Sequence, residues 1–261
     1  MSEAATSSDV VRVAELDGGA VWHVVLATPK ANIVDSPKIR ALHAIFLRAS
    51  RTPALKAIVL EGEGAHFSYG ASVEEHLPAN CAAMLASLHA MLQALLECHV
   101  PCLAAVRGQC LGGGLELVAL CHRIFAARDA RLGQPETVLG VFAPVGSLAL
   151  TERLGRGAAE DLLLSGRSLL VEEARALGLV DEVVEDPRAA ALDYARKHLL
   201  PKSASSLRFA VRAARLSLEE RFRHELPRLE KLYLEELMHS ADALEGLDAF
   251  VTKRPPRWRN A

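Results

Sequence analysis

The sequence lacks the features of a membrane, secreted or nucleic-acid-binding protein. Across 261 residues no apolar stretch approaches the roughly 20 residues that a membrane-spanning helix needs, and residues 1–9 are small and polar, unlike a secretory signal. The formal net charge is −2 and no long basic run occurs, so the sequence predicts no basic surface that would bind the phosphates of a nucleic acid. We therefore expect a cytoplasmic protein with no membrane and no nucleic-acid partner.

The spacings typical of metal sites, disulfide frameworks and two common hydrolase classes are also missing. The ten histidines are scattered, with no His-x-x-x-His and no Cys-x-x-Cys, so we expect no metal. Neither Gly-x-Ser-x-Gly nor Gly-x-x-x-x-Gly-Lys is present, which argues against serine hydrolases and nucleotide hydrolases. The cysteines are odd in number and lie in apolar segments, which favours buried free thiols at Cys81, Cys98, Cys102, Cys110 and Cys121.

The residues that indicate a function are concentrated between Pro101 and Gly155. An apolar run over residues 101–106 predicts a buried strand, and three glycines at 112–114 precede an apolar helix start. A strand, a glycine loop and a helix N-terminus leave unpaired N–H groups that suit an anion or a developing oxyanion. Glu116 falls in the first turn of that helix, where its carboxylate is either buried in the core or faces a pocket.

A second carboxylate follows at another break in the pattern. Pro135 favours a turn or a helix start, so Glu136 should be held on a rigid corner. One interpretation is that Glu136 caps the next helix. The other is that Glu116 and Glu136 work as an acid and base pair beside a thioester, which the glycine loop and the apolar surroundings favour.

The remaining segments predict an α/β chain. Val10–Leu16 and Val21–Leu26 flank a glycine turn and predict a hairpin, and Ser36 is the predicted cap of a helix that begins at residues 36–37. Composition alone suggests a doubly wound sheet. Other predicted elements are strands over 57–61 and 67–71, a helix over 82–98 and tail helices over 203–216, 218–238 (with a break at Pro227) and 241–253. Apolar tail positions that need a partner, on this core or on another subunit, are Leu229, Leu232, Tyr233, Leu234 and Leu237.

The segments GQCLGGGLEL and LGQPETVLG resemble the signature of the crotonase family, the enoyl-CoA hydratases and isomerases. The resemblance extends across most of the chain and implies a crotonase (ClpP-like) spiral core of ββα turns over residues 1–202, in place of a doubly wound sheet. It also implies an all-helical oligomerisation region over residues 203–261, which builds homotrimers that pair into homohexamers. An acyl-CoA thioester is then the substrate, and no separate cofactor is expected because coenzyme A is part of it.

The same resemblance implies roles for individual residues. The two oxyanion N–H groups fall on Ala71 and Gly113, and the two glutamates that hold and activate water fall on Glu116 and Glu136. Lys253 would meet a CoA phosphate, although a solvated lysine is the simpler interpretation of that residue. The positions implied in substrate or CoA binding are Lys30, Ala31, Tyr69, Gly70, Gly112, Phe142, Phe250 and Lys253.

Departures from the usual hydratase pattern narrow the expected substrate. Ser72 stands where an isomerase needs a carboxylate, and the run FAPVGS at 142–147 replaces the usual Gly-Gly-Thr. With Tyr69 and the segment LYLEELM at 232–238, these departures resemble the branch that hydrates cyclohexa-1,5-diene-1-carbonyl-CoA to a 6-hydroxycyclohex-1-ene product in anaerobic benzoyl-CoA degradation. The alternatives are a general enoyl-CoA or cyclohex-1-ene-carbonyl-CoA hydratase and a thioester hydrolase. A non-enzymatic RNA-binding or assembly role is disfavoured by the retained glutamates and the missing basic patch.

Overall fold

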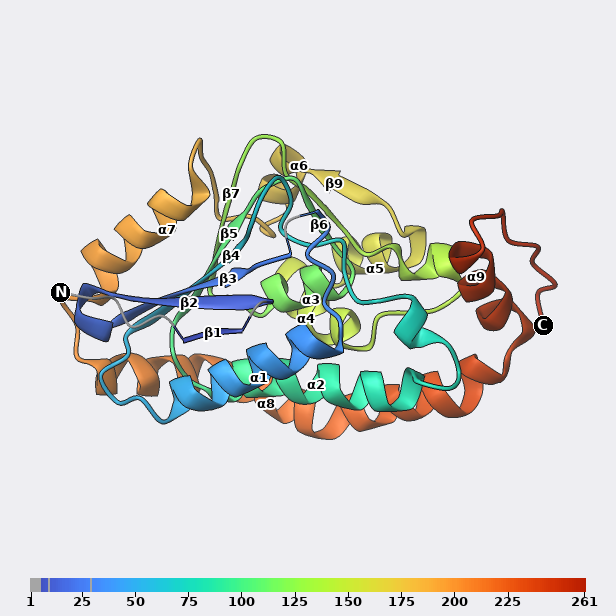
Figure 1. Ribbon diagram of the computed structural model, residues 1–261, viewed down its shortest axis with the longest axis horizontal. Helices are drawn as coiled ribbons and strands as arrows, with labels where there is room; N and C mark the ends of the chain where they lie inside the picture. The colour runs from blue at the N-terminus through green and yellow to red at the C-terminus, as the bar shows by residue number, and fades with distance from the viewer. Residues whose placement is uncertain (1–5, 9, 29) are drawn as a thin grey trace.

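The computed structural model describes residues 6–8, 10–28 and 30–261, and its backbone is built on two sheets (Figure 1). The larger sheet has the strand order β1-β2-β3-β4-β5-β7-β10, and the smaller has the order β6-β8-β9. From β3 to β10 the neighbours in the large sheet are parallel, which requires crossover connections between them. The strands are β1 Thr6–Ser8, β2 Val11–Leu16, β3 Val21–Leu26, β4 Ala57–Gly62, β5 Cys102–Val106, β6 Gln109–Leu111, β7 Arg123–Ala126, β8 Arg131–Gly133, β9 Ser168–Leu170 and β10 Glu182–Val183.

Helices supply both the covering layers and the C-terminal region. Figure 1 shows α1, α2 and α8 as a layer below the large sheet, with α7 above it and α9 at the far end of the molecule. The helices are α1 Ser36–Ser50, α2 Cys81–Glu97, α3 Gly113–Ala119, α4 Pro144–Leu154, α5 Arg156–Ser165, α6 Val171–Ala176, α7 Pro187–Tyr194, α8 Ala204–Lys231 and α9 Ala241–Val251. Short helical turns are η1 Asp17–Gly19, η2 Glu74–His76, η3 Pro135–Leu139, η4 Ala195–Leu199, η5 Leu232–Glu236 and η6 Leu237–His239.

The central strands are apolar on both faces because helices cover both faces of the sheet. In β4, Ile58 and Leu60 belong to the main core cluster, whereas Ala57 and Val59 belong to a smaller cluster that includes Ala191 of α7. This split follows from the two-residue period of a strand, which sends successive side chains to opposite faces. The α/β character predicted from the sequence is confirmed.

Local predictions were confirmed where the pattern was strong and wrong at three positions. The hairpin of β2 and β3 is present, with Leu16 opposite Val21. The predicted strand over 67–71 is reduced to isolated bridges, because the positive φ of Gly70 (+99°) turns the chain out of an extended course. Asp35 caps α1 in place of the predicted Ser36, since Asp35 has the extended backbone and its carboxylate accepts from the Lys38 N–H.

Pro227 was predicted to break the tail helix, and that prediction was wrong. Helix α8 runs without interruption from Ala204 to Lys231 with the proline inside it. A proline removes one intrahelical hydrogen bond, but Leu218, Phe222 and Leu226 on the same helix are buried against the main core. That burial holds the helix together across the lost bond.

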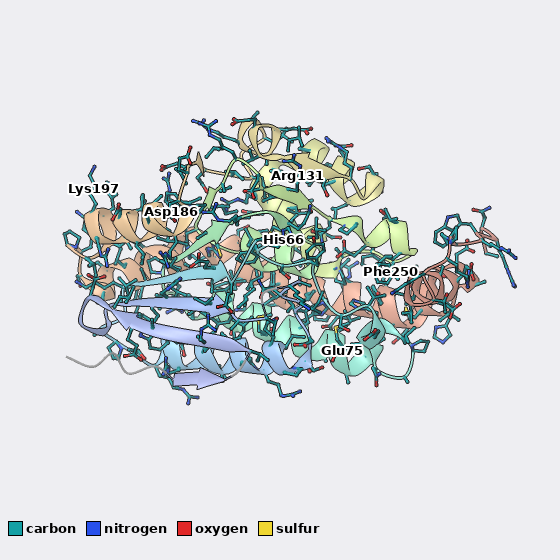
Figure 2. The ribbon with its side chains drawn as sticks, turned by 45° about the horizontal axis from the view of Figure 1, so that its top comes forward. His66, Glu75, Arg131, Asp186, Lys197 and Phe250 are labelled. Carbon is teal, nitrogen blue, oxygen red and sulfur yellow. The ribbon has the colours of Figure 1, made fainter. Side chains whose placement is uncertain are left out.

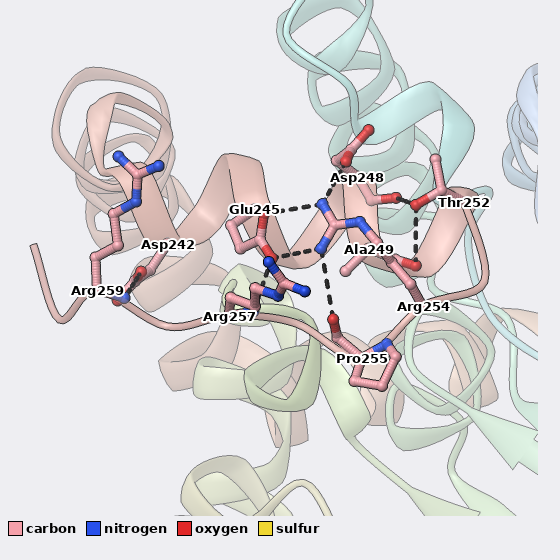
Figure 3. Close-up of polar contacts among 9 residues, drawn as sticks. All are labelled: Asp242, Glu245, Asp248, Ala249, Thr252, Arg254, Pro255, Arg257 and Arg259. Atoms are coloured by element: carbon pink, nitrogen blue, oxygen red, sulfur yellow. Dashed lines mark hydrogen bonds and ion pairs between the residues drawn. The ribbon is translucent and has the colours of Figure 1, made fainter.

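The C-terminal arm, residues 254–261, folds back along α9 (Figure 3). Arg254 pairs with Glu245 and Asp248, and the backbone N–H of Arg259 donates to Asp242 at 2.6 Å. These contacts fix α9, which carries Phe250, and Figure 2 shows Phe250 on the side of α9 that faces the body of the chain. Among the described residues no helix is long and apolar enough to cross a bilayer.

Candidate active site

Two backbone N–H groups from separate segments meet at the N-terminus of α3. The loop after β6 brings Gly113 against Ala71, so that a Cβ placed on Gly113 would lie 3.2 Å from the Ala71 nitrogen. Among the residues that the structure describes, neither N–H is paired with a backbone oxygen. Two free N–H groups at the start of a helix can both bind one oxygen that carries negative charge. This is the geometry of an oxyanion hole.

The approach of these segments depends on glycine at two positions. Gly70 has a φ of +99°, and a Cβ there would lie 2.9 Å from the carbonyl oxygen of Leu111. Gly112 has a φ of +51°, and a Cβ there would lie 2.8 Å from Oε1 of Glu136. A side chain at either position would therefore strain the backbone and push the oxyanion hole or the carboxylate away.

Glu116 is buried, with 3% of its surface exposed, and its carboxylate reaches the N-terminus of α4. Oε1 accepts a hydrogen bond of 2.7 Å from the N–H of Gly146, in the first turn of that helix. Burial raises the pKa of Glu116, whereas a positive charge on His89 and the N–H groups of Gly146 and Val145 oppose that rise. The helix end thus stabilises the ionised form of a carboxyl group that burial alone would keep neutral.

Glu136 lies in η3, and its carboxyl group has little support. Gln134 Nε2 donates to Oε1 at 3.0 Å, while Oε2 is shielded from solvent and has no partner among the described residues. Burial first, and then the negative charge of Glu116, raise the pKa of Glu136 to about 8. The two carboxyl groups therefore lie within electrostatic reach of each other, and burial raises the pKa of both; N–H groups oppose the rise at Glu116, whereas the charge of Glu116 adds to it at Glu136.

Glu136 lies in the first turn of η3, the short helix that begins at Pro135, which is the position that the capping interpretation expects. Helix α4 follows Glu136 in the chain, but the Gly146 N–H of its first turn is bonded by Glu116. Glu136 instead contacts Gln134 and lies close to Gly112. Glu136 therefore stands in the first turn of its own short helix, while Glu116 makes the contact with the N-terminus of α4.

A pocket of about 570 Å³ lies beside the oxyanion hole, between the segment around Ala71, η3 and α9. Its wall includes Ala71 of the N–H pair and Pro135, Val138 and Leu139 of η3, whereas Glu116 and Glu136 do not line it; Pro135 is the residue before Glu136. A largely apolar pocket next to these groups suits a thioester with a long, partly apolar carrier. The predicted residues that line it are Ala31, Tyr69, Ala71, Phe250 and Lys253.

Three further predicted residues border the site without lining the pocket, and one lies outside it. Gly70 and Gly112 belong to the tight backbone approach described above. Phe142 lies between the anchor points of the two carboxyl groups in the chain, and its ring centroid is 5.3 Å from that of Tyr233. Lys30 is exposed and does not line the pocket.

Two buried side chains that hold the pocket wall were missed as site residues. Asn32, with a positive φ of +46°, donates from its side-chain amide to the carbonyl oxygens of Glu63 and His66. Lys38 is fully buried, and its ammonium group donates to Thr28 Oγ1 and to the Ile33 carbonyl, both at 2.6 Å. Burial lowers the pKa of Lys38 to about 8. The family resemblance implied binding roles for Lys30 and Ala31, but nothing local indicated that a lysine of α1 would support this segment.

Gln134 was also missed, although it stands inside the sequence LGQPETVLG. It is 1% exposed and holds Oε1 of Glu136. A polar residue between a buried strand and a proline is a weak signal, because the strand end itself accounts for it. Within the described ranges no group of three His, Cys, Asp or Glu side chains is placed to hold a metal ion.

Two sheets of largely parallel strands, with two free N–H groups near the carboxyl groups of Glu116 and Glu136, have the architecture of a crotonase-fold protein. The enoyl-CoA hydratase/isomerase family model matches residues 17–261. The chain belongs to the enoyl-CoA hydratase/isomerase family. The crotonase fold predicted from the sequence motifs is confirmed.

Individual relatives agree with this family and differ in how similar they are. The chain is 52% identical over 242 residues to cyclohexa-1,5-dienecarbonyl-CoA hydratase of Thauera aromatica, covering 93% of this chain and 94% of the relative. It is 31% identical over 255 residues to carnitinyl-CoA dehydratase of Proteus mirabilis, covering 92% and 95%. Among solved structures, an enoyl-CoA hydratase/isomerase from Pseudoalteromonas atlantica is 26% identical with a TM-score of 0.83, covering 99% of this chain and 100% of the other.

Proposed function

We propose that this protein is a hydro-lyase that adds water to cyclohexa-1,5-diene-1-carbonyl-CoA and forms 6-hydroxycyclohex-1-ene-1-carbonyl-CoA. The observation that carries the reaction type is the oxyanion pair of Ala71 and Gly113 beside the carboxyl groups of Glu116 and Glu136. The identity to the Thauera aromatica hydratase supports the choice of acyl group. The step moves water and a proton and no electrons, so coenzyme A within the substrate is the only cofactor that the proposal needs.

The thioester oxygen binds to the N–H groups of Ala71 and Gly113. As water adds to the β carbon, electron density moves onto that oxygen and an enolate forms. N–H groups that are already in position stabilise this charge without rearrangement, and each such donor is worth about 3 kcal/mol in comparable sites. The N-terminus of α3 adds its positive potential at the same place.

The two carboxyl groups divide the proton transfers between them. Glu116, whose ionised form is favoured by the N-terminus of α4, takes a proton from the water whose oxygen bonds to the β carbon. Glu136 has a pKa of about 8, so at neutral pH it holds a proton that it can give. The base is therefore Glu116 and the acid is Glu136, an assignment that the sequence left open.

The second ring double bond decides where the proton goes. The enolate is conjugated with that double bond, so its electron pair can form a new C–H bond at the far end of the diene. The hydroxyl group then lies on the former β carbon and the remaining double bond lies between them, which is a net 1,4-addition. A proton passed from Glu116 to Glu136 restores both groups for the next turnover.

The pocket and the cysteines support the rest of the proposal. Tyr69, Phe250 and the other apolar walls suit the carrier arm of the thioester, and Lys253, which lines the pocket just beyond α9, would meet a phosphate of CoA. All five cysteines are buried free thiols, and the sulfur atoms of Cys102 and Cys121 lie 3.6 Å apart without a disulfide. Free thiols at this spacing fit a reducing compartment, and we place the enzyme in the cytoplasm.

A panel of acyl-CoA thioesters, with products identified by mass, tests this function. We expect the dienoyl thioester to gain the mass of one water and to react faster than crotonyl-CoA or cyclohex-1-ene-1-carbonyl-CoA. Release of free CoA without a hydroxyacyl product would indicate a thioester hydrolase instead. Equal rates with straight-chain and cyclic thioesters would reduce the proposal to a general enoyl-CoA hydratase.

A further inference from the structure

The hydroxyl group of Tyr233 is buried without a hydrogen-bond partner. Tyr233 lies in η5, directly after α8, with 1% of its surface exposed. Within the described part of the chain nothing pairs with its Oη atom. A buried tyrosine hydroxyl normally finds a partner, because removing it from water without one costs free energy. Apolar packing alone explains the ring of Tyr233 and leaves its hydroxyl group unexplained.

Phe142 places Tyr233 beside the two catalytic glutamates. The ring centroids of Phe142 and Tyr233 are 5.3 Å apart, with an interplanar angle of 56°. Just before Phe142, the N–H of Val141 donates to the backbone carbonyl of Glu136 at 3.1 Å. Four residues after Phe142, Gly146 holds the Glu116 carboxylate. Tyr233 therefore packs on the short segment that connects the anchor points of both glutamates.

The electrostatics agree with this position. Burial, then the charge of Cys81, then those of Glu136 and Glu116 raise the pKa of Tyr233 above its usual range. Both catalytic carboxyl groups thus lie within electrostatic reach of the phenol. A hydroxyl group in these surroundings keeps its proton at every pH at which the enzyme works, so it is always available as a neutral hydrogen-bond donor.

Resting on the proposed function, we propose that Tyr233 Oη belongs to the active site and donates a hydrogen bond to the oxygen atom that is added to the ring. Glu116 in its ionised form can only accept hydrogen bonds from that oxygen, and Glu136 uses its proton for carbon. A third group that always donates holds the oxygen in line with the β carbon. In the reverse direction the same hydrogen bond stabilises the departing hydroxide.

This hydrogen bond would also favour substrates whose product carries a hydroxyl group deep in the site. A buried donor rejects an analogue that lacks its acceptor, because the donor is then left unpaired. The thioester 6-hydroxycyclohex-1-ene-1-carbonyl-CoA has that acceptor, and cyclohex-1-ene-1-carbonyl-CoA does not. The two compounds have the same ring and the same carrier, so they form a matched pair of ligands.

Tyr233→Phe tests the proposal, because it removes the hydroxyl group and keeps the ring that packs on Phe142. We expect turnover of the dienoyl thioester to fall about 10- to 100-fold, the worth of one hydrogen bond to a partly charged oxygen, with KM changed by less than about twofold. Affinity for the 6-hydroxy thioester should fall about tenfold and affinity for the deoxy thioester should stay the same. The melting temperature should be unchanged or higher, because an unpaired buried hydroxyl group has been removed.

Tyr194→Phe is the matched control. Tyr194 is the last residue of α7, and its ring packs against that of Phe125 in β7, with the centroids 5.8 Å apart. Tyr194 does not line the pocket. We expect this variant to keep full turnover and both affinities.

Two results with the Tyr233→Phe variant would overturn the inference alone. Turnover of Tyr233→Phe within twofold of the wild type would show that the hydroxyl group does not take part. Equal losses of affinity for the 6-hydroxy and deoxy thioesters would show that the substitution disturbs packing and removes no specific hydrogen bond. A wild-type enzyme that leaves the dienoyl thioester unchanged refutes the proposed function and this inference with it, whereas an active wild type with an equally active Tyr233→Phe refutes the inference alone.

Discussion

Replacing Glu136 by glutamine should separate its contribution to catalysis from its effect on folding. Glutamine keeps the size of the side chain and can still bond to the amide of Gln134, but it can neither ionise nor give up a proton. We expect turnover to fall by about 100-fold or more, the usual worth of a positioned acid or base. Binding of the thioester should survive, because the pocket walls and the oxyanion hole are unchanged.

The same substitution should make the protein more stable at alkaline pH. The pKa of Glu136 is about 8 in the folded protein, against an ordinary value of 4.5 for a glutamate in the unfolded chain. Between these values the folded protein keeps a proton that the unfolded chain loses, so the free energy of unfolding falls as pH rises and levels off above pH 8. One pKa unit corresponds to about 1.4 kcal/mol, which limits the penalty between pH 5 and pH 8 to about 4 kcal/mol. Although its carboxyl group is shielded, Glu136 as a residue is half-buried, so we reduce this limit for screening by nearby solvent and expect about 2 kcal/mol.

Urea unfolding at pH 5 and pH 8 measures this difference. Glu136→Gln should exceed the wild type in stability at pH 8 by about 2 kcal/mol and nearly equal it at pH 5, because glutamine has no proton to lose. Glu172→Gln is the control, since Glu172 is an exposed carboxylate in the first turn of α6. It should lose only a fraction of a kcal/mol at both pH values and keep full activity. A Glu136→Gln enzyme that is as fast as the wild type, and less stable at both pH values, would refute the acid assignment.

Three other predictions concern the pair, the loop and the tail. The double variant Glu116→Gln/Glu136→Gln should turn over scarcely more slowly than the slower single variant, because the losses caused by groups that act as a unit are not additive. A loss of turnover equal to the product of the two single losses would contradict this. Gly112→Ala should lower turnover at least about tenfold, because the new Cβ would lie 2.8 Å from Glu136 Oε1, and kinetics near the wild-type values would argue against that contact. Light scattering should give a trimer-based assembly, of about 170 kDa if six chains of 28.1 kDa associate. Deletion from Ser203 should abolish this assembly, and a full-length monomer at micromolar concentration would refute the prediction.

Exposed apolar side chains give the assembly prediction a physical basis. Phe209 and Leu216 of α8 are 67% and 54% exposed. Leu232, one of the apolar positions noted in the tail, is 42% exposed, whereas Tyr233 beside it is buried in this chain. Burying the exposed side chains of Phe209, Leu216 and Leu232 against other subunits would stabilise the assembly, in proportion to the apolar area that each side chain removes from water.

The sequence alone determined the features that depend on neighbours along the chain. Alternating and apolar runs identified the β2–β3 hairpin and the buried strands β4 and β5, because the two-residue period is a local property. The glycine triplet before Glu116 indicated free N–H groups at the start of α3 for the same reason. The motif around Glu136 indicated the family, but both the capping and the catalytic interpretation were compatible with it.

Only the tertiary structure decided which groups meet. The N-terminus of α4 reaches back to Glu116, so the first glutamate takes the helix contact and the second is left with a raised pKa. Packing of α8 on the core overrode the helix-breaking tendency of Pro227 and brought Tyr233 near Glu116 and Glu136, which are distant from it in the sequence. Desolvation and electrostatic reach depend on what surrounds an atom in three dimensions. A linear pattern of residue types does not contain that information, and only the folded chain supplies it.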